Sequence, residues 1–322
     1  METTPDHLVP AAHTNDGFFK AVFSQAEHAV AFFKSHLPLA ITARIDWTSL
    51  TVIPGSFIKS SLQQIHSDLL FSVLVGGRET LLYLLFEHQS TVDPAMPLRL
   101  LGYITEILIQ HHKSHGLPLP PVLPIVLHQG PETWNISTSF EDLFEIPADL
   151  VADLLPFLPK FQHALLDLAQ CDPASQEDDT RLRVVLQLMK LAREKELLLF
   201  FQWLAGIPAS DLPDNLLGLM LLYALHVDSD LDAKQIFNKL STNPELEQST
   251  MSVAEKLKAE GRMEGRMEGQ EKGLWIGKIQ TLQEFLDMQV GSRESLEIMT
   301  LGELEALQQE LLRDYETRFK RP

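Results

Sequence analysis

Residues 67–89 read SDLLFSVLVGGRETLLYLLFEHQ, and this stretch decides the fold. Two apolar, strand-like runs flank the pair Gly76-Gly77, which is the pattern of a β-hairpin. A four-residue loop that starts at Gly76 pairs Val75 with Thr80, whereas a two-residue loop at the glycines gives a different register. Either way, the stretch predicts two adjacent antiparallel strands of one sheet.

The flanking sequence adds helices and two more strands. Residues 16–36 follow good capping residues and place apolar side chains on one face, which predicts a helix. The β-branched stretch 41–55 predicts an irregular strand, residues 97–115 a second helix, and the apolar run 120–130 a short strand entered through prolines. A helix between strands of one sheet implies a crossover. We therefore predict an α/β fold in which helices flank a mixed sheet.

Beyond residue 135 the sequence shows no further strand pattern, and apolar residues recur at helical spacing. We predict three regions: an α/β core in residues 1–135, an all-α domain in 136–250 and a charged helical tail in 251–322. In the tail, glycine recurs every fourth residue from Gly261 to Gly277. Each such glycine costs a helix about 1 kcal/mol. The repeat predicts a helix that is flexible or stabilised by a partner, and a linker without a role is the alternative.

The net charge of −18 is concentrated in the C-terminal part of the chain. Residues 1–135 carry 7 Lys and Arg against 11 Asp and Glu, and the remaining residues carry 19 against 33. This balance repels nucleic-acid phosphates, so binding to DNA has to come from local groups. The single cysteine excludes an internal disulfide, and no apolar run approaches the roughly 20 residues that span a bilayer. We expect a cytoplasmic protein without a membrane contact.

Polar side chains converge at one end of the hairpin. In the register of the longer loop, Asp68 faces Glu87. Gln89 then shares the face of Glu87, and His66 lies opposite Gln89. Two carboxylates at this spacing repel each other unless a cation separates them, and Mg²⁺ binds one or two carboxylates together with water and phosphate oxygens. The pattern favours a magnesium site, and simple polar ends of two apolar strands are the alternative.

Six short motifs occur in order between residues 13 and 145: NDGFFKAVF, PGSF, SDLL, FEHQS, RLLGYITEI and LPIVLHQG. In this order they resemble the Rpn family of recombination-promoting nucleases, also called YhgA-like putative transposases. The resemblance implies a PD-(D/E)XK-type nuclease fold, Mg²⁺-dependent cleavage of DNA and a role in recombination or mobile-element biology.

The resemblance also assigns roles to the hairpin residues. Asp68 matches the metal-binding aspartate of the family, and Glu87 and Gln89 match its ExQ motif. It implies that Asp68 and Glu87 hold the metal and that Gln89 orients the attacking water or a phosphate oxygen. The wider superfamily often has lysine at the position of Gln89, and a glutamine does not supply that positive charge.

Four further residues are candidates for accessory contacts with substrate. Asp16 and Lys20 lie in the first motif, where the family pattern begins His-Asp and this chain has Asn15 before Asp16. One helical turn separates Asp16 from Lys20, so an ion pair on a solvated face is the simpler interpretation. His66 belongs to the hairpin group. His128 ends the last strand beside it, where capping of the strand end explains it equally well.

These patterns together predict a Mg²⁺-dependent DNA endonuclease of the Rpn type. Two alternatives stay open: a nuclease-like scaffold that binds protein partners through its acidic helical half, and a nuclease that acts on RNA. The sequence has no zinc motif and no basic recognition helix, so weak, salt-sensitive and poorly sequence-specific DNA binding is expected. The C-terminal helices are the candidate contact for a homo-oligomer.

Overall fold

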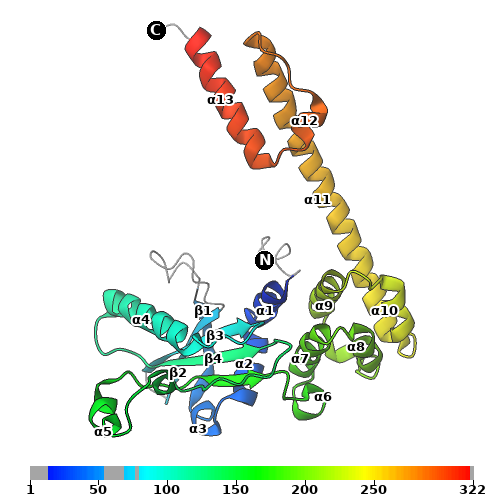
Figure 1. The fold of residues 1–322 in the computed structure, drawn as a ribbon. Helices are drawn as coiled ribbons and strands as arrows, with labels where there is room; N and C mark the ends of the chain where they lie inside the picture. The colour runs from blue at the N-terminus through cyan, green and yellow to red at the C-terminus, as the bar shows by residue number, and fades with distance from the viewer. Residues whose placement is uncertain (1–13, 54–68, 77–79, 320–322) are drawn as a thin grey trace. The chain divides into compact units, whose positions relative to one another are not determined.

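The computed structural model describes residues 14–53, 69–76 and 80–319 (Figure 1). The chain divides into two compact units, residues 1–251 and 252–322. Among the described residues, no helix combines the length and the apolar character needed to cross a membrane.

The first unit contains the sheet and most of the helices. Its α/β part consists of α1 (Asn15–Phe23), α2 (Ala26–His36), α3 (Leu39–Thr42), β1 (Ile45–Ile53), β2 (Leu69–Val75), β3 (Thr80–Gln89), α4 (Met96–His115) and β4 (Val122–His128). The chain continues through α5 (Val151–Leu154), β5 (Ala164–Asp167), α6 (Pro173–Gln176), α7 (Thr180–Arg193), α8 (Leu197–Leu204), α9 (Asp214–Val227) and α10 (Ala233–Leu240). Short 3₁₀ turns lie at Phe140–Leu143, Leu155–Phe157 and Ala209–Asp211.

Five strands form one mixed sheet in the order β1-β2-β3-β4-β5. The first three strands are antiparallel, and β4 and β5 each run parallel to the strand before them. In the hairpin, Val75 pairs with Thr80, so the register predicted for the longer loop is confirmed. The predicted irregularity of the first strand is a register shift between Asp46 and Thr51. The α/β fold with helices flanking a mixed sheet is confirmed.

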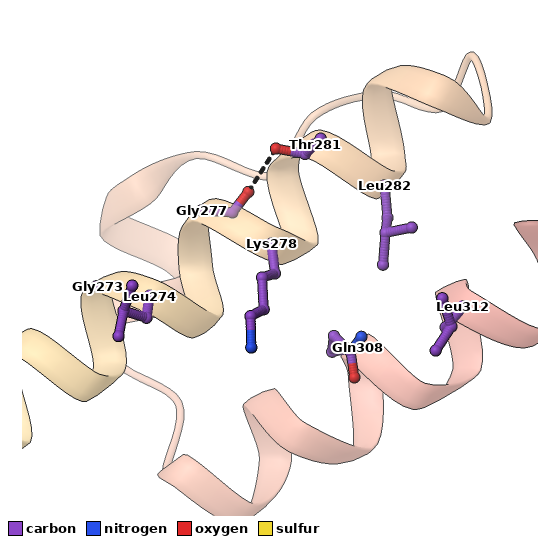
Figure 2. Close-up of a pocket in the computed structure, with 8 residues that line it drawn as sticks. All are labelled: Gly273, Leu274, Gly277, Lys278, Thr281, Leu282, Gln308 and Leu312. Carbon is purple, nitrogen blue, oxygen red and sulfur yellow. Dashed lines mark hydrogen bonds between the residues drawn. The ribbon is translucent and has the colours of Figure 1, made fainter.

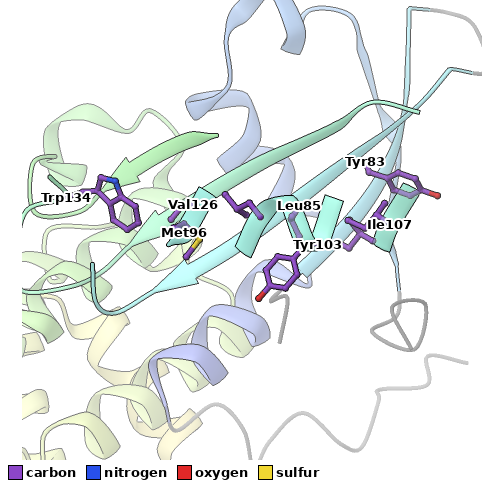
Figure 3. Close-up of a cluster of buried hydrophobic side chains, with 9 residues drawn as sticks. Tyr83, Leu85, Met96, Tyr103, Ile107, Val126 and Trp134 are labelled. Atoms are coloured by element: carbon purple, nitrogen blue, oxygen red, sulfur yellow. The ribbon is translucent and has the colours of Figure 1, made fainter. Parts of the chain in front are cut away.

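Helices cover both faces of the sheet. On one face, the rings of Phe19, Phe23 and Phe32 lie with their centroids 4.8, 5.2 and 4.3 Å from that of Phe86 in β3. The other face packs against α4 through a buried cluster (Figure 3): Leu70, Tyr83, Leu85, Met96, Leu100, Tyr103, Ile107, Val126 and Trp134. Side chains alternate along a strand, so each position in β3 meets either α1 and α2 or α4.

The helix predicted over residues 16–36 is two helices. α1 closes with the N–H of Ser24 bonded to the carbonyl of Lys20 at 3.0 Å, and Gln25 then takes an extended conformation with ψ of 121° before α2 begins. Phe86 of β3 contacts phenylalanines of both helices, Phe19 and Phe23 of α1 and Phe32 and Phe33 of α2, so the apolar pattern continues across the break. The periodicity therefore predicted burial correctly and missed the break.

The fifth strand corrects the expectation that no strand lies beyond residue 135. β5 pairs in parallel with β4, with Ala164 beside Ile125 and Asp167 beside His128. Its four residues, ALLD, are too few to show an alternation. The strand exists because β4 offers an open edge to pair with, which local sequence does not record. The rest of segment 136–250 is built mainly from helices.

The second unit is a helical hairpin. It contains the C-terminal part of α11 (Pro244–Phe285), then α12 (Arg293–Glu297) and α13 (Leu301–Phe319). Its buried core consists of Ile276, Ile279, Leu286, Leu296, Leu304 and Leu311. The glycine repeat lies within α11, as the helical prediction required. Gly273 and Gly277 border a groove of about 540 Å³ between α11 and α13, beside Leu274 and Leu312 (Figure 2).

Candidate active site

Three parallel strands end at the same edge of the sheet, and each ends in a polar side chain. Gln89 closes β3, His128 closes β4 and Asp167 closes β5. The register pairs Gln89 with His128 and His128 with Asp167, so the three residues form a row across the sheet. Residues paired in this way project from one face. Glu87, two residues earlier in β3, projects from the same face.

Glu87 is fully buried, and a carboxylate removed from water needs a compensating charge. Arg99 of α4 supplies it, with Nη2 lying 3.9 Å from Oε2 of Glu87. The guanidinium also donates to Oδ2 of Asp93 at 2.9 Å, and at 3.4 Å to Oε1 of Gln89 and to the hydroxyl of Tyr103. Burial disfavours the charge on Arg99, but the hydrogen bonds with Asp93 and Tyr103 outweigh it and raise the pKa of the guanidinium.

An open pocket with a volume of about 430 Å³ adjoins this group. Its lining consists of Thr14, Asn15, Asp16, His88, Gln89, Ser90 and Arg99. Gln89 is half-buried and the Arg99 side chain is 36% exposed, so a ligand in the pocket can reach both. Nζ of Lys20 lies 3.1 Å from Oδ2 of Asp16, which confirms the interpretation of these two residues as an ion pair on α1.

His88 points to the opposite face of β3 and stacks on Phe19, with ring centroids 5.1 Å apart. Its Nε2 lies 2.8 Å from Oε1 of Gln129, which can only accept, so the proton is on Nε2. Nε2 of Gln129 donates to the carbonyl of Met189 at 2.8 Å and to the hydroxyl of Tyr223 at 2.9 Å. Burial lowers the pKa of His88, which favours the neutral ring. One carboxamide thus connects β3 with α7 and α9.

His128 is fully buried, and its Nδ1 lies 3.0 Å from Oδ1 of Asp167. The carboxylate also accepts from the backbone N–H groups of Trp134 at 2.8 Å and Ala169 at 3.0 Å, and from Nε2 of Gln170 at 3.0 Å. Burial works to raise the pKa of Asp167, but these hydrogen bonds outweigh it and the pKa is lowered. An ionised Asp167 holds the proton on Nδ1 of His128 and leaves a lone pair on Nε2.

His128 borders a second, smaller cavity of about 160 Å³ that Thr91, Val92, Pro131 and Glu132 also line. Within the described part of the chain, Nε2 of His128 has no hydrogen-bond partner. Gly130 keeps the space beside it open, because a Cβ at this position would collide with Nε2 and with the carbonyl oxygen of Ser90. A side chain at residue 130 would therefore force the His128 ring to move.

A family model described as YhgA-like putative transposase matches residues 13–212. The chain belongs to this family. The recombination-promoting nuclease RpnC of Escherichia coli strain K12 is 28% identical over 199 residues, which cover 62% of this chain and 65% of RpnC. The chain thus spans slightly less than two thirds of that relative.

Two further relatives come from the same strain. The recombination-promoting nuclease RpnA is 26% identical over 271 residues, or 82% of this chain and 88% of RpnA. The inactive recombination-promoting nuclease-like protein RpnE is 24% identical over 250 residues, or 77% of this chain and 82% of RpnE. No solved structure matches the chain.

In this YhgA-like chain, the structure brings together some of the predicted site residues. Glu87 and Gln89 share one face of β3 and both contact Arg99. His128 lies one strand away, in register with Gln89. The predicted residues Asp68 and His66 lie outside the described residues.

The oxygen atoms of the described site residues are of the type that binds magnesium. Glu87 and Gln89 offer carboxylate and amide oxygens, and Mg²⁺ commonly takes only one or two carboxylates from a protein. In residues 14–53, 69–76 and 80–319, no cluster of three or more His, Cys, Asp or Glu side chains could hold a metal ion. Of the two carboxylates predicted to hold magnesium, Glu87 is the one that lies among the described residues.

Reasoning from the sequence missed two residues of this YhgA-like site, Arg99 and Asp167. Arg99 lies in the first turn of α4, where a cation opposes the helix dipole. That unfavourable placement was a usable signal that another group holds the side chain. Asp167 follows only three apolar residues of β5, and nothing in its neighbourhood distinguished it from a surface aspartate.

Proposed function

We propose that this chain is a Mg²⁺-dependent DNA endonuclease of PD-(D/E)XK type, which hydrolyses phosphodiester bonds in recombination or mobile-element biology. The observation that carries the proposal is the fully buried Glu87 carboxylate, on the same strand face as Gln89 and beside Arg99 at an open pocket. The names of RpnC and RpnA, which describe recombination-promoting nucleases, support the reaction class.

In this proposal Glu87 and Asp68 hold the metal ion. Bound there, Mg²⁺ supplies positive charge that lowers the pKa of a bound water and offsets charge on the phosphoryl oxygens. Gln89 orients the attacking water or a phosphate oxygen. Its Oε1 accepts from Arg99, which leaves its N–H groups to donate.

The remaining predicted residues take accessory roles. Asp16 lines the same pocket as Gln89, so a substrate there passes the Asp16–Lys20 ion pair. His66 and His128 are proposed as substrate contacts at the hairpin and at the end of β4. The protein would act in the cytoplasm, with α11 and α13 as the candidate contact between copies.

Nicking of supercoiled plasmid DNA by the purified chain tests the proposal. Wild type, Glu87→Ala and Glu145→Ala are compared with Mg²⁺ and with EDTA, because Glu145 is an exposed glutamate of the same unit and provides the matched control. We expect cleavage with Mg²⁺ by wild type and Glu145→Ala. Glu87→Ala should be inactive, and EDTA should stop every reaction.

The other outcomes identify the alternatives. Cleavage by Glu87→Ala at the wild-type rate would remove Glu87 from the site. Absence of cleavage by folded wild type would favour a scaffold that binds protein partners, which the similarity to the inactive relative RpnE and the acidic helical half also support. Competition between DNA and RNA of the same sequence would show which nucleic acid is the substrate.

A further inference from the structure

The pocket beside Gln89 contains a cation, Arg99, that was not among the predicted site residues. Of the described residues that line this pocket, Arg99 is the one with a positive charge at every physiological pH. Gln89 is neutral, and Nε2 of His88 lies 2.8 Å from Oε1 of Gln129 on the other face of β3. Among the described lining residues, the permanent positive charge that a phosphodiester meets is therefore the guanidinium of Arg99 on α4.

Arg99 is anchored and still has donors to offer. Its short hydrogen bond, 2.9 Å long, is with Asp93, whereas its bonds to Gln89 and Tyr103 are 3.4 Å long and its distance to Glu87 is 3.9 Å. N–H···O bonds are usually between about 2.7 and 3.2 Å, so the contacts beyond Asp93 are weak. A guanidinium carries five N–H donors in a planar fork that matches two phosphate oxygens. An anionic oxygen in the pocket would form shorter bonds than Gln89 and Glu87 do.

Arg99 also lies where it can supply the positive charge that Gln89 lacks. Glutamine does not supply the charge of a lysine, yet the guanidinium lies 3.4 Å from its Oε1. We propose that Arg99 is the phosphate-binding cation of this site, and that it donates to phosphoryl oxygens of the substrate while Glu87 serves the metal. The catalytic consequence of this inference rests on the proposed nuclease function, whereas its phosphate contact is measurable without cleavage.

The test is the salt dependence of DNA binding. A short fluorescent DNA duplex is titrated with the full chain by anisotropy in Ca²⁺, after a gel has confirmed that no cleavage occurs. Wild type is compared with Arg99→Gln, Arg99→Lys and Arg44→Gln. Arg44 is an exposed arginine of the same unit, so Arg44→Gln makes the same change of charge away from the pocket.

Loss of one phosphate contact lowers the slope of log K against log salt concentration by about 0.9 for duplex DNA. We expect this change in Arg99→Gln, and wild-type slopes in Arg99→Lys and Arg44→Gln. In Mg²⁺, cleavage by Arg99→Gln should fall by about 10²-fold or more, as when one donor to a developing charge is removed. Arg99→Lys should retain intermediate activity because it keeps the charge but loses the planar fork.

An unchanged slope in folded Arg99→Gln would overturn the inference and leave Arg99 as a charge partner of Asp93 and Glu87. So would a wild type that fails to bind the duplex at low salt. If Arg99→Gln does not fold, the double variant Glu87→Gln with Arg99→Gln removes both charges and is compared with Glu87→Gln. If the salt slope changes in Arg99→Gln but wild type does not cleave DNA, the phosphate contact of Arg99 is supported and the proposed nuclease function is rejected. If wild type cleaves DNA and the salt slopes of wild type and Arg99→Gln are equal, the nuclease function is supported and the proposed role of Arg99 is rejected.

Discussion

Asp167 is expected to stabilise strongly the sheet edge at which β3, β4 and β5 end. The substitution Asp167→Asn measures this contribution to the free energy of unfolding. The carboxylate accepts four hydrogen bonds, with His128 and Ala169 on Oδ1 and Trp134 and Gln170 on Oδ2. An asparagine offers one oxygen, so two donors lose their acceptor and face an NH₂ group instead. A buried donor without a partner costs about 1–3 kcal/mol, so Asp167→Asn should lower the free energy of unfolding by about 3 kcal/mol.

Urea denaturation followed by circular dichroism provides the assay, with Asp46→Asn as the control. Asp46 is exposed and accepts from Thr48, so its substitution should cost less than about 1 kcal/mol. The lowered pKa of Asp167 means that its stabilisation is full above the unfolded value of about 3.9 and is lost as the pH falls through the folded value. The gap between wild type and Asp167→Asn should therefore narrow in acid. A cost equal to that of Asp46→Asn at neutral pH would refute the reasoning.

Two further predictions concern pH and assembly. Burial lowers the pKa of His163 from 6.5 to about 4, so the folded state holds the ring in its neutral form. The free energy of unfolding is therefore unaffected by this group above about pH 6.5, and it falls as the pH drops from there toward 4. Between about pH 7 and about pH 5, wild type should lose about 2 kcal/mol more unfolding free energy than His163→Phe in urea titrations, and equal losses would contradict this. If the second unit joins two copies, sedimentation should show a dimer for the full chain and a monomer for a chain that ends at Met251. Two monomers would reject the contact.

The hairpin was predictable because two independent signals agree in it. Gly76 sets the turn, and the apolar runs on both sides allow the observed pairing of Val75 with Thr80. Alternation then places Glu87 and Gln89 on one face and His88 on the other, as the contacts with Arg99 and Phe19 show. These features depend on residues close together in the chain, which sequence patterns represent well.

The missed features depend on distant pairing. β5 forms only because β4 is beside it, and its four residues carry no pattern of their own. The partnership of Asp167 with His128 joins residues 39 positions apart and follows from that pairing. Arg99 was visible in the sequence, but the direction of its side chain is set by how α4 lies on the sheet. Local periodicity predicts that a helix packs against the sheet through its apolar face. It does not predict which edge of the sheet each turn of the helix lies next to.

The bonds of Gln129 have a consequence for how the chain can be shortened. Its carboxamide accepts from His88 of β3 and donates to Met189 and Tyr223 of the helical segment, and all of these groups are buried. A chain that ends near residue 135 would leave the two N–H groups of Gln129 without their acceptors, at about 1–3 kcal/mol each, which is a large part of the whole stability of a domain. The sheet and the helices that follow it should therefore unfold in a single cooperative transition. Fragments that end before α9 would be recovered as aggregates, and the first place where the chain can be shortened without that loss is near Met251.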